Sequence, residues 1–255
     1  MSRIFARSLV GPRVVGAASI VVVFALVELA IRSNVINGLI VPRPSAVLLN
    51  FGRLYGREHL LTATLWTFCE VLVAGFFVTI IGVPVGVVLH RIRLLGNAFE
   101  TWIAAFAAAP ITLAYPIFLV IFGRNSAAII VFAVIAGLPP VILKTREGLA
   151  RIRPVFLDVS KALQLSGADQ FFRIELPAAM ATIFTGIRLG LIVTLIAVIA
   201  LEYLVGISGL GLLVGDLADR YDLAGTYGTI AFVILVSAGM FALLEAIERR
   251  LKGRL

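Results

Sequence analysis

The sequence predicts an all-α protein: a polytopic bundle of about six transmembrane helices that forms a single domain over residues 1–255. Hydrophobic residues make up 61% of the chain and charged residues only 14%, whereas soluble domains average about 45–50% and about 25%. The mean hydropathy of +1.08 agrees with this balance. A soluble enzyme, a disordered chain and a disulfide-stapled secreted module are therefore excluded, the last because Cys69 is the one cysteine.

Six apolar runs approach the roughly 20 residues that a spanning helix needs. They are Val14–Ile31, Leu61–Leu89, Ala98–Phe122, Ala127–Leu143, Ala181–Val205 and Thr226–Ile247. The second run is long enough to tilt or to extend beyond the hydrocarbon. Pro110 and Pro116 fall inside the third run, and Pro139 and Pro140 inside the fourth. We expect kinks or short breaks at both places.

The basic residues predict the orientation. Of the 22 Lys and Arg residues, 15 lie in segments that share a side with the N-terminus, 6 lie on the other side, and Arg188 lies within the fifth run. The positive-inside rule therefore places both termini in the cytoplasm. The net charge of +8 reflects these loops. Nucleic-acid binding is disfavoured, because the aromatic residues lie inside apolar runs and are not interleaved with basic ones.

The segment Lys144–Leu176, between the fourth and fifth runs, is too long for a tight turn. Its first part has helical spacing, with apolar Val159, Ala162 and Leu163 against polar Asp158, Ser160 and Lys161. Pro154 suits the first turn of this helix. We expect a short helix that turns its polar side away from the bundle.

A second short helix is expected to follow a break at Ser166-Gly167. Ser166 can cap it, with Asp169 three residues later in the capping-box position, and Pro177 is expected to end it. On pattern alone, a helix pair that only covers the bundle is as good an interpretation as a docking element.

The residues of this loop carry a more specific signal. Its residues are Asp158-Val159-Ser160, then Gln164, then Ile174-Glu175-Leu176-Pro177. This order resembles the Glu-Ala-Ala loop of ATP-binding-cassette importer permeases, which reads Glu-Ala-Ala, three residues, Gly, nine residues, Ile-x-Leu-Pro. Gln164 replaces the glycine, so we expect ordinary helix at that position.

Other segments resemble the nitrate, sulfonate and taurine subfamily of these permeases. They are Val41–Val47 with its two prolines, Gly186-Ile187-Arg188, Glu202 and Ser208–Gly211. The resemblance implies one half of a dimeric pore in the bacterial inner membrane, which takes up a small solute. It also implies that the loop of residues 144–176 is a coupling element that docks in a cytoplasmic ATPase. The residues expected to couple are Asp158, Ser160, Lys161, Gln164, Ser166, Gly167, Ile174, Leu176 and Pro177.

The expected partners follow from this resemblance. The chain has no G-x-x-x-x-G-K-[ST] phosphate loop, so ATP and Mg²⁺ are expected on a separate ATPase subunit. We expect no cofactor, metal or catalytic residue on this chain, which is not expected to be an enzyme. The other expected partners are a second permease copy or a sister permease, a periplasmic or lipid-anchored solute-binding protein, and membrane lipid.

Polar residues within the spans are candidates for a translocation pathway or gate, because ionisable groups are costly in a membrane. They are Glu70, Thr112, Tyr115, Arg188, Glu202 and Tyr203. All of them except Tyr203 also have a plainer interpretation. Glu70 could pair with an arginine, Arg188 could reach anionic headgroups, Glu202 could make a structural hydrogen bond, and Thr112 and Tyr115 could pack in the core.

Two other function classes stay open at this point. An ion-gradient-driven secondary transporter or channel subunit would show inverted repeats and broken helices at the midplane, and we find no internal repeat. A membrane-embedded enzyme would need clustered His, Cys or acidic residues, but His59 and His90 both lie near span ends.

Overall fold

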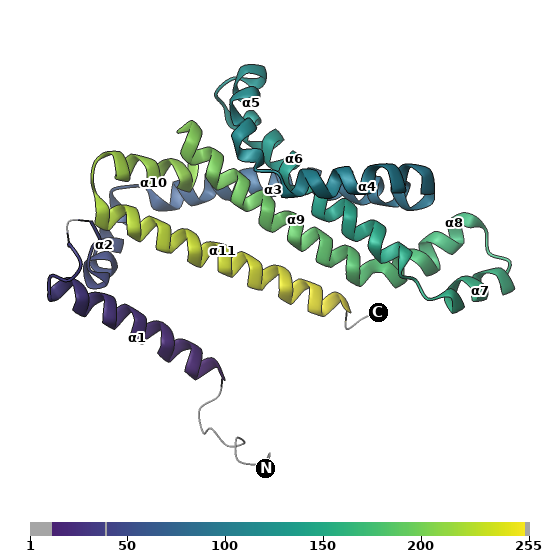
Figure 1. Ribbon diagram of the computed structural model, residues 1–255, viewed down its shortest axis with the longest axis horizontal. Helices are drawn as coiled ribbons and strands as arrows, with labels where there is room; N and C mark the ends of the chain where they lie inside the picture. Colours follow the sequence, from purple (N-terminus) through teal and green to yellow (C-terminus); the bar gives the residue numbers. More distant parts are fainter. Residues whose placement is uncertain (1–11, 39, 253–255) are drawn as a thin grey trace, which may run out of the picture.

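The computed structural model describes residues 12–38 and 40–252, and within them every regular element is a helix (Figure 1). The elements are α1 (Pro12–Arg32), α2 (Pro44–Gly56), α3 (Leu60–Arg91), α4 (Arg93–Ala108), the 3₁₀ helix η1 (Ile111–Ala114), α5 (Tyr115–Phe122), α6 (Ser126–Ala150), α7 (Pro154–Ala162), α8 (Gly167–Gln170), the π-helical turn η2 (Phe171–Glu175), α9 (Leu176–Val205), α10 (Gly209–Asp219) and α11 (Leu223–Lys252). Both chain ends, to which the orientation prediction refers, lie outside the described residues.

Five helices in the described part are long and apolar enough to cross a membrane, or six if the bent pair α4 with η1–α5 counts as one span. This confirms a polytopic helical membrane fold of about the expected size. The third expected span is broken: Arg93–Ala108 and Ile111–Phe122 meet at an angle of 85°. Pro110 precedes η1 and Pro116 lies in the first turn of α5, so both prolines lie at the break.

No break forms at Pro139 and Pro140, so a short break at the second expected place is wrong. Helix α6 runs without interruption through Pro139 and Pro140. Many side chains of α6 are buried against α3 and α9, the two helices with which it makes its most extensive contacts. Packing on both sides holds the helix together where the prolines remove hydrogen bonds.

The core lies where α3, α6 and α9 run side by side (Figure 1). Ile129 and Phe132 of α6 pack with Val71 of α3 and with Val198 and Leu201 of α9, and all five side chains are buried. The close approach depends on small residues, since a Cβ at Gly137 would lie 3.0 Å from the Gly190 carbonyl oxygen.

Helix α1 lies apart from this core (Figure 1) and most of its apolar side chains are exposed. It is tied to α2 by Glu28, which accepts hydrogen bonds from the Ser45 N–H (3.1 Å) and Ser45 Oγ (2.9 Å). This carboxylate caps the N-terminus of α2, where Pro44 supplies no N–H. The exposed apolar faces are typical of a chain surrounded by lipid or by further subunits.

The two ends of the bundle differ. Helices α7 and α8 project at one end, and α2, α10 and the turn into α11 lie at the other (Figure 1). We refer to these as the α7 end and the α10 end. Helix α1 finishes at the α10 end and α11 begins there, so the outer ends of both helices, Pro12 and Lys252, point away from it.

Candidate functional site

The loop at the α7 end is shorter than expected. Helix α6 continues to Ala150, so the expected loop start at Lys144 is wrong and residues 144–150 are helical. Helix α7 begins with Pro154 in its first turn, as expected. The projecting unit is α7 followed by α8, which continues through η2 into α9.

The structure of α7 agrees with the predicted polar side at Asp158 and Lys161 but differs from it at Ser160. Ser160 is 1% exposed and donates to the Leu157 carbonyl at 2.6 Å, so its hydroxyl is satisfied within the helix and can be buried. Val159 is exposed, and Leu163 is 64% exposed. Asp158 and Lys161 form an exposed pair at 3.6 Å. The outward surface of α7 is therefore largely apolar, with Val155, Phe156, Val159 and Leu163 on it.

Gln164 is the turning point of the loop, and the expectation of ordinary helix there is wrong. Its φ is +49°, in the left-handed region. The Leu165 N–H donates to the Ser160 carbonyl (3.1 Å) and the Gln164 N–H to the Lys161 carbonyl (3.0 Å). These two bonds form a Schellman motif, which places a left-handed residue one position after the helix C-cap. Gln164 thus takes the conformation that a glycine adopts without strain.

The start of the second helix is confirmed and its end is not. Ser166 accepts a hydrogen bond from the Asp169 N–H (3.2 Å) and donates to Asp169 Oδ2 (2.7 Å). Pro177 does not end the helix, because it lies in the first turn of α9 directly after the π-helical turn. A helix from Gly167 to Val205 is thereby continuous.

The last residues of the loop anchor it to the bundle. Ile174, Leu176 and Pro177 are half-buried. Leu176 packs with Phe171 against the buried cluster that includes Leu149. The α7–α8 unit is therefore held at both ends by spanning helices, through α6 on one side and α9 on the other.

The left-handed turn gives a testable expectation. Gln164→Gly should be tolerated or should stabilise the loop by about 1 kcal/mol, because glycine adopts positive φ without a steric cost. Gln164→Val should weaken it by roughly 1–2 kcal/mol, because a β-branched residue is strained there. Hydrogen exchange of the amides in residues 159–166 measures this difference. Slower exchange in the valine variant than in the glycine variant would contradict the geometry.

At the α10 end, Glu202 is fully buried and fastens one helix to two others. Its Oε2 accepts the Gly211 N–H at 2.9 Å, and the Thr67 hydroxyl lies 2.7 Å from Oε1. The Thr67 hydroxyl also accepts the Leu210 N–H at 2.8 Å. Glu202 of α9 and Thr67 of α3 together cap the N-terminus of α10, whose own Ser208 makes no side-chain capping bond.

The turn into α10 requires glycine. Gly209 has φ +82°, and a Cβ there would overlap the Glu202 carboxylate. Glu70 is 2% exposed and accepts a 3.4 Å hydrogen bond from Ser208 Oγ in the same turn. The ion pairs in the described part of the chain include no arginine at Glu70, so that expectation is wrong.

Tyr203 is exposed, whereas its neighbour Glu202 is buried. Tyr203 and Thr112 line a cavity of about 560 Å³ between η1, α9, α10 and α11, with Ile199, Val214 and Ser237 among its walls. The structure thus brings together two of the expected pathway residues in an apolar site. Tyr115 instead packs against the core cluster.

Arg188 is held by a residue that sequence reasoning missed. Its guanidinium forms an ion pair with buried Glu248 at 3.0 Å and lies over the Phe241 ring, while Thr185 Oγ1 lies 3.1 Å from the same carboxylate. Its contacts tie α9 to α11, so the expectation that it reaches lipid headgroups is wrong. No local pattern could have indicated this pairing, because the partners are far apart in sequence.

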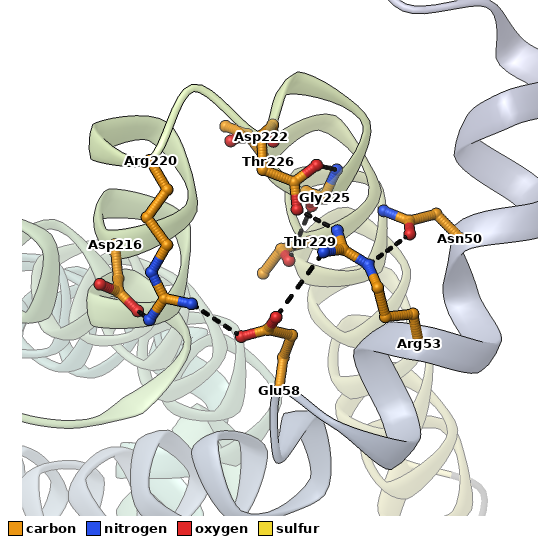
Figure 2. Close-up of polar contacts among 9 residues, drawn as sticks. All are labelled: Asn50, Arg53, Glu58, Asp216, Arg220, Asp222, Gly225, Thr226 and Thr229. Carbon is orange, nitrogen blue, oxygen red and sulfur yellow. Dashed lines mark hydrogen bonds and ion pairs between the residues drawn. The ribbon is translucent and has the colours of Figure 1, made fainter.

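A charge network joins α2, α10 and the start of α11 (Figure 2). Arg53 contacts Asp222 directly and lies 3.8 Å from Glu58. Arg220 lies 3.4 Å from Glu58 on its other side and contacts Asp216. Glu58, at the α2–α3 turn, therefore bridges two arginines from different elements.

Asp222 also begins α11, because its Oδ1 accepts the Gly225 N–H at 3.0 Å. Burial favours the neutral acid, but the hydrogen bonds from Arg53 and Gly225 and the charges of Arg53 and Arg220 outweigh it and lower the pKa of the Asp222 carboxyl. Asp222 is thus ionised throughout the neutral range.

Comparison with known proteins agrees with this architecture. The family profile of the binding-protein-dependent transport system inner membrane component matches residues 78–253. The chain belongs to this family. It is a multi-pass inner-membrane transport permease. Its membrane-spanning helices and the similar proteins described below both support this conclusion.

Several similar permeases belong to importers. The chain is 24% identical to the taurine transport system permease protein TauC of Escherichia coli (strain K12) over 86% of this chain and 81% of that protein. It is 34% identical to the bicarbonate transport system permease protein CmpB of Synechocystis sp. over 54% of this chain and 49% of that protein. It is 27% identical to the nitrate import permease protein NrtB of the same organism over 54% of this chain and 50% of that protein. The chain thus spans about half the length of the last two.

The fold is also found among solved structures. An inward-facing structure of the MetNI methionine ABC transporter matches with a TM-score of 0.65 and 22% identity, over 76% of this chain and 97% of that chain. The family and the fold together confirm the prediction that the chain is a transmembrane subunit of an ATP-binding-cassette importer.

Proposed function

We propose that this permease forms half of a dimeric pore and is driven by a separate cytoplasmic ATPase, which carries the ATP and Mg²⁺, through its α7–α8 unit. The exposed apolar surface of α7 carries the proposal. Four apolar side chains project from a short helix that is anchored to two spanning helices. Such a surface is typical of a protein contact, and its anchoring lets a push on α7 move α6 and α9 together.

The orientation follows from this proposal. Docking of α7 on a cytoplasmic ATPase places the α7 end in the cytoplasm, together with the outer ends of α1 and α11. The α10 end then faces outward, where a solute-binding protein delivers the solute. The names of the similar taurine, bicarbonate and nitrate permeases support a small solute with an acidic group. Thr112 and Tyr203 are proposed to border its path.

The test is protection of α7 by the ATPase. In a Cys69→Ser background, Leu163→Cys places one thiol on the exposed face of α7 without removing the Ser166 cap. A bulky maleimide should label the isolated permease rapidly and the assembled transporter at least about tenfold more slowly, because a protein interface excludes solvent from its centre.

The matched control is Val35→Cys, whose site is 80% exposed at the other end of the bundle. Its labelling should be the same with and without the ATPase. Equal labelling of Leu163→Cys in both preparations would refute docking at α7. Failure of an ATPase to copurify would favour an ion-gradient-driven transporter or a channel subunit instead.

A further inference from the structure

A second cavity, of about 540 Å³, opens at the α10 end between the α2–α3 turn and α10. Its walls include Arg57, His59 and Trp66 on one side and Ser208 and Arg220 on the other. It is separate from the apolar cavity at Tyr203 and has a much more polar lining. Charged and hydroxyl side chains around a concave site are the features that orient a small polar ligand.

The lining of this cavity carries two arginines and two carboxylates, but the two arginines differ in their contacts. Its two carboxylates, Glu58 and Asp216, are both contacted by Arg220, and Glu58 also lies near Arg53 (Figure 2). By contrast, the Arg57 guanidinium has no ion pair or hydrogen bond in the described part of the chain, although it lines the same cavity. Both carboxylates of the lining are therefore engaged by Arg220, and the Arg57 guanidinium is the cation of the lining that no carboxylate of the described residues contacts.

The network also fixes where Arg57 lies. Its backbone N–H ends α2 by donating to the Arg53 carbonyl at 2.8 Å, and the next residue, Glu58, is held between two arginines. His59 follows with φ +52° and starts α3. Arg57 is therefore at the rim of the cavity on a short turn with both sides anchored.

We propose that this cavity binds a small inorganic or organic anion, with Arg57 as its charged ligand and the Thr62 hydroxyl as a further donor. A guanidinium offers several N–H donors in a plane that matches a carboxylate or another oxyanion. That the bound anion is the transported solute on its way to the pore rests on the proposed function. The binding itself does not.

Trp66 makes the cavity observable, because it lines the wall and the chain has only one other tryptophan, Trp102. In a Trp102→Phe background, iodide serves as an anionic probe that quenches Trp66 fluorescence, and acrylamide serves as a neutral one. The measurement uses the purified full-length permease in vesicles of zwitterionic lipid, which add no net lipid charge and no other tryptophan. Arg57→Gln should reduce quenching by iodide about twofold or more, through loss of local anion attraction. Quenching by acrylamide should not change.

The matched control is Arg43→Gln, which removes the same charge from an exposed residue near the same end but outside the cavity. It should leave iodide quenching unchanged, and Arg57→Lys should retain most of it. Added sulfate should compete with iodide only when Arg57 is present. Iodide quenching that is equal in Arg57→Gln and in the parent would overturn the proposal, provided acrylamide shows that the cavity is intact.

The quenching test of the anion site and the labelling test of ATPase docking can fail independently of each other. Iodide quenching that depends on Arg57 together with unprotected Leu163→Cys would refute docking of the ATPase and leave the anion site standing. Protected Leu163→Cys with quenching that ignores Arg57 would refute the anion site alone.

Discussion

Gly137→Ala should destabilise the permease by about 1–3 kcal/mol, the usual cost of inserting a methyl group into a closely packed core. The new Cβ would overlap Thr194 Oγ1 and lie 3.0 Å from the Gly190 carbonyl oxygen. The hydroxyl cannot move freely, because it donates to that carbonyl at 2.8 Å. Helices α6 and α9 would have to separate, and they make the most extensive helix contact in the described part of the chain. Thermal unfolding of the purified permease measures the loss.

The control for this substitution is Gly239→Ala on α11, where an added Cβ has no neighbour within 4 Å. This variant should be neutral or more stable, because alanine favours helix over glycine by up to about 1 kcal/mol. Gly137→Val should be worse than Gly137→Ala. Equal unfolding temperatures for Gly137→Ala and Gly239→Ala would show that α6 and α9 do not approach as closely as described.

The spans and their breaks show how far local sequence information reaches. Long apolar runs located the spanning helices because each needs about 20 apolar residues, and Pro110 located the sharp bend. The same rule failed at Pro139 and Pro140, where burial on both sides of α6 keeps the helix continuous. A proline signals a possible break, and its neighbours decide whether one forms.

The loop that contains α7 and α8 shows a different limit of prediction from local sequence. Ser166 was identified as a cap because capping depends only on residues within one turn. Gln164 was misjudged because its residue type favours ordinary helix, yet the Schellman bonds of α7 require positive φ there. The position of Gln164 in the family pattern, where glycine is usual, was the better signal. Local spacing also does not show that the apolar side of α7 is exposed, because spacing predicts which residues share a face and not what lies against that face.

Contacts that join distant segments could not be predicted from any pattern. Thr67 and Glu202 are 135 residues apart, and Arg53 and Asp222 are 169 residues apart. Glu202 was singled out because an acidic residue in a span is unusual. Thr67, its partner, is an ordinary span residue and carried no such signal.

Glu202→Ala should release the N-terminus of α10. The substitution leaves the Gly211 N–H without its acceptor in a buried site, at a cost of about 1–3 kcal/mol, and leaves the Thr67 hydroxyl only the Ala63 carbonyl at 3.2 Å. Amide exchange at Leu210 and Gly211 should therefore accelerate by roughly 5- to 150-fold if local opening limits it. Glu202→Gln keeps an oxygen that can accept the Gly211 N–H, so its exchange should stay close to that of the parent.

The control is Asp219→Ala, which removes an exposed carboxylate from the other end of the same helix and should not affect exchange at Gly211. A transport assay distinguishes a structural capping role of Glu202 from a gating role. If α10 forms part of the outer gate, Glu202→Ala should hydrolyse ATP without transport while the complex stays assembled, since a shift of this size changes a two-state equilibrium severalfold. Unchanged transport and unchanged basal hydrolysis would limit Glu202 to a structural cap. A glutamine variant as defective as alanine would show that the negative charge is required and that a hydrogen-bond acceptor is not sufficient.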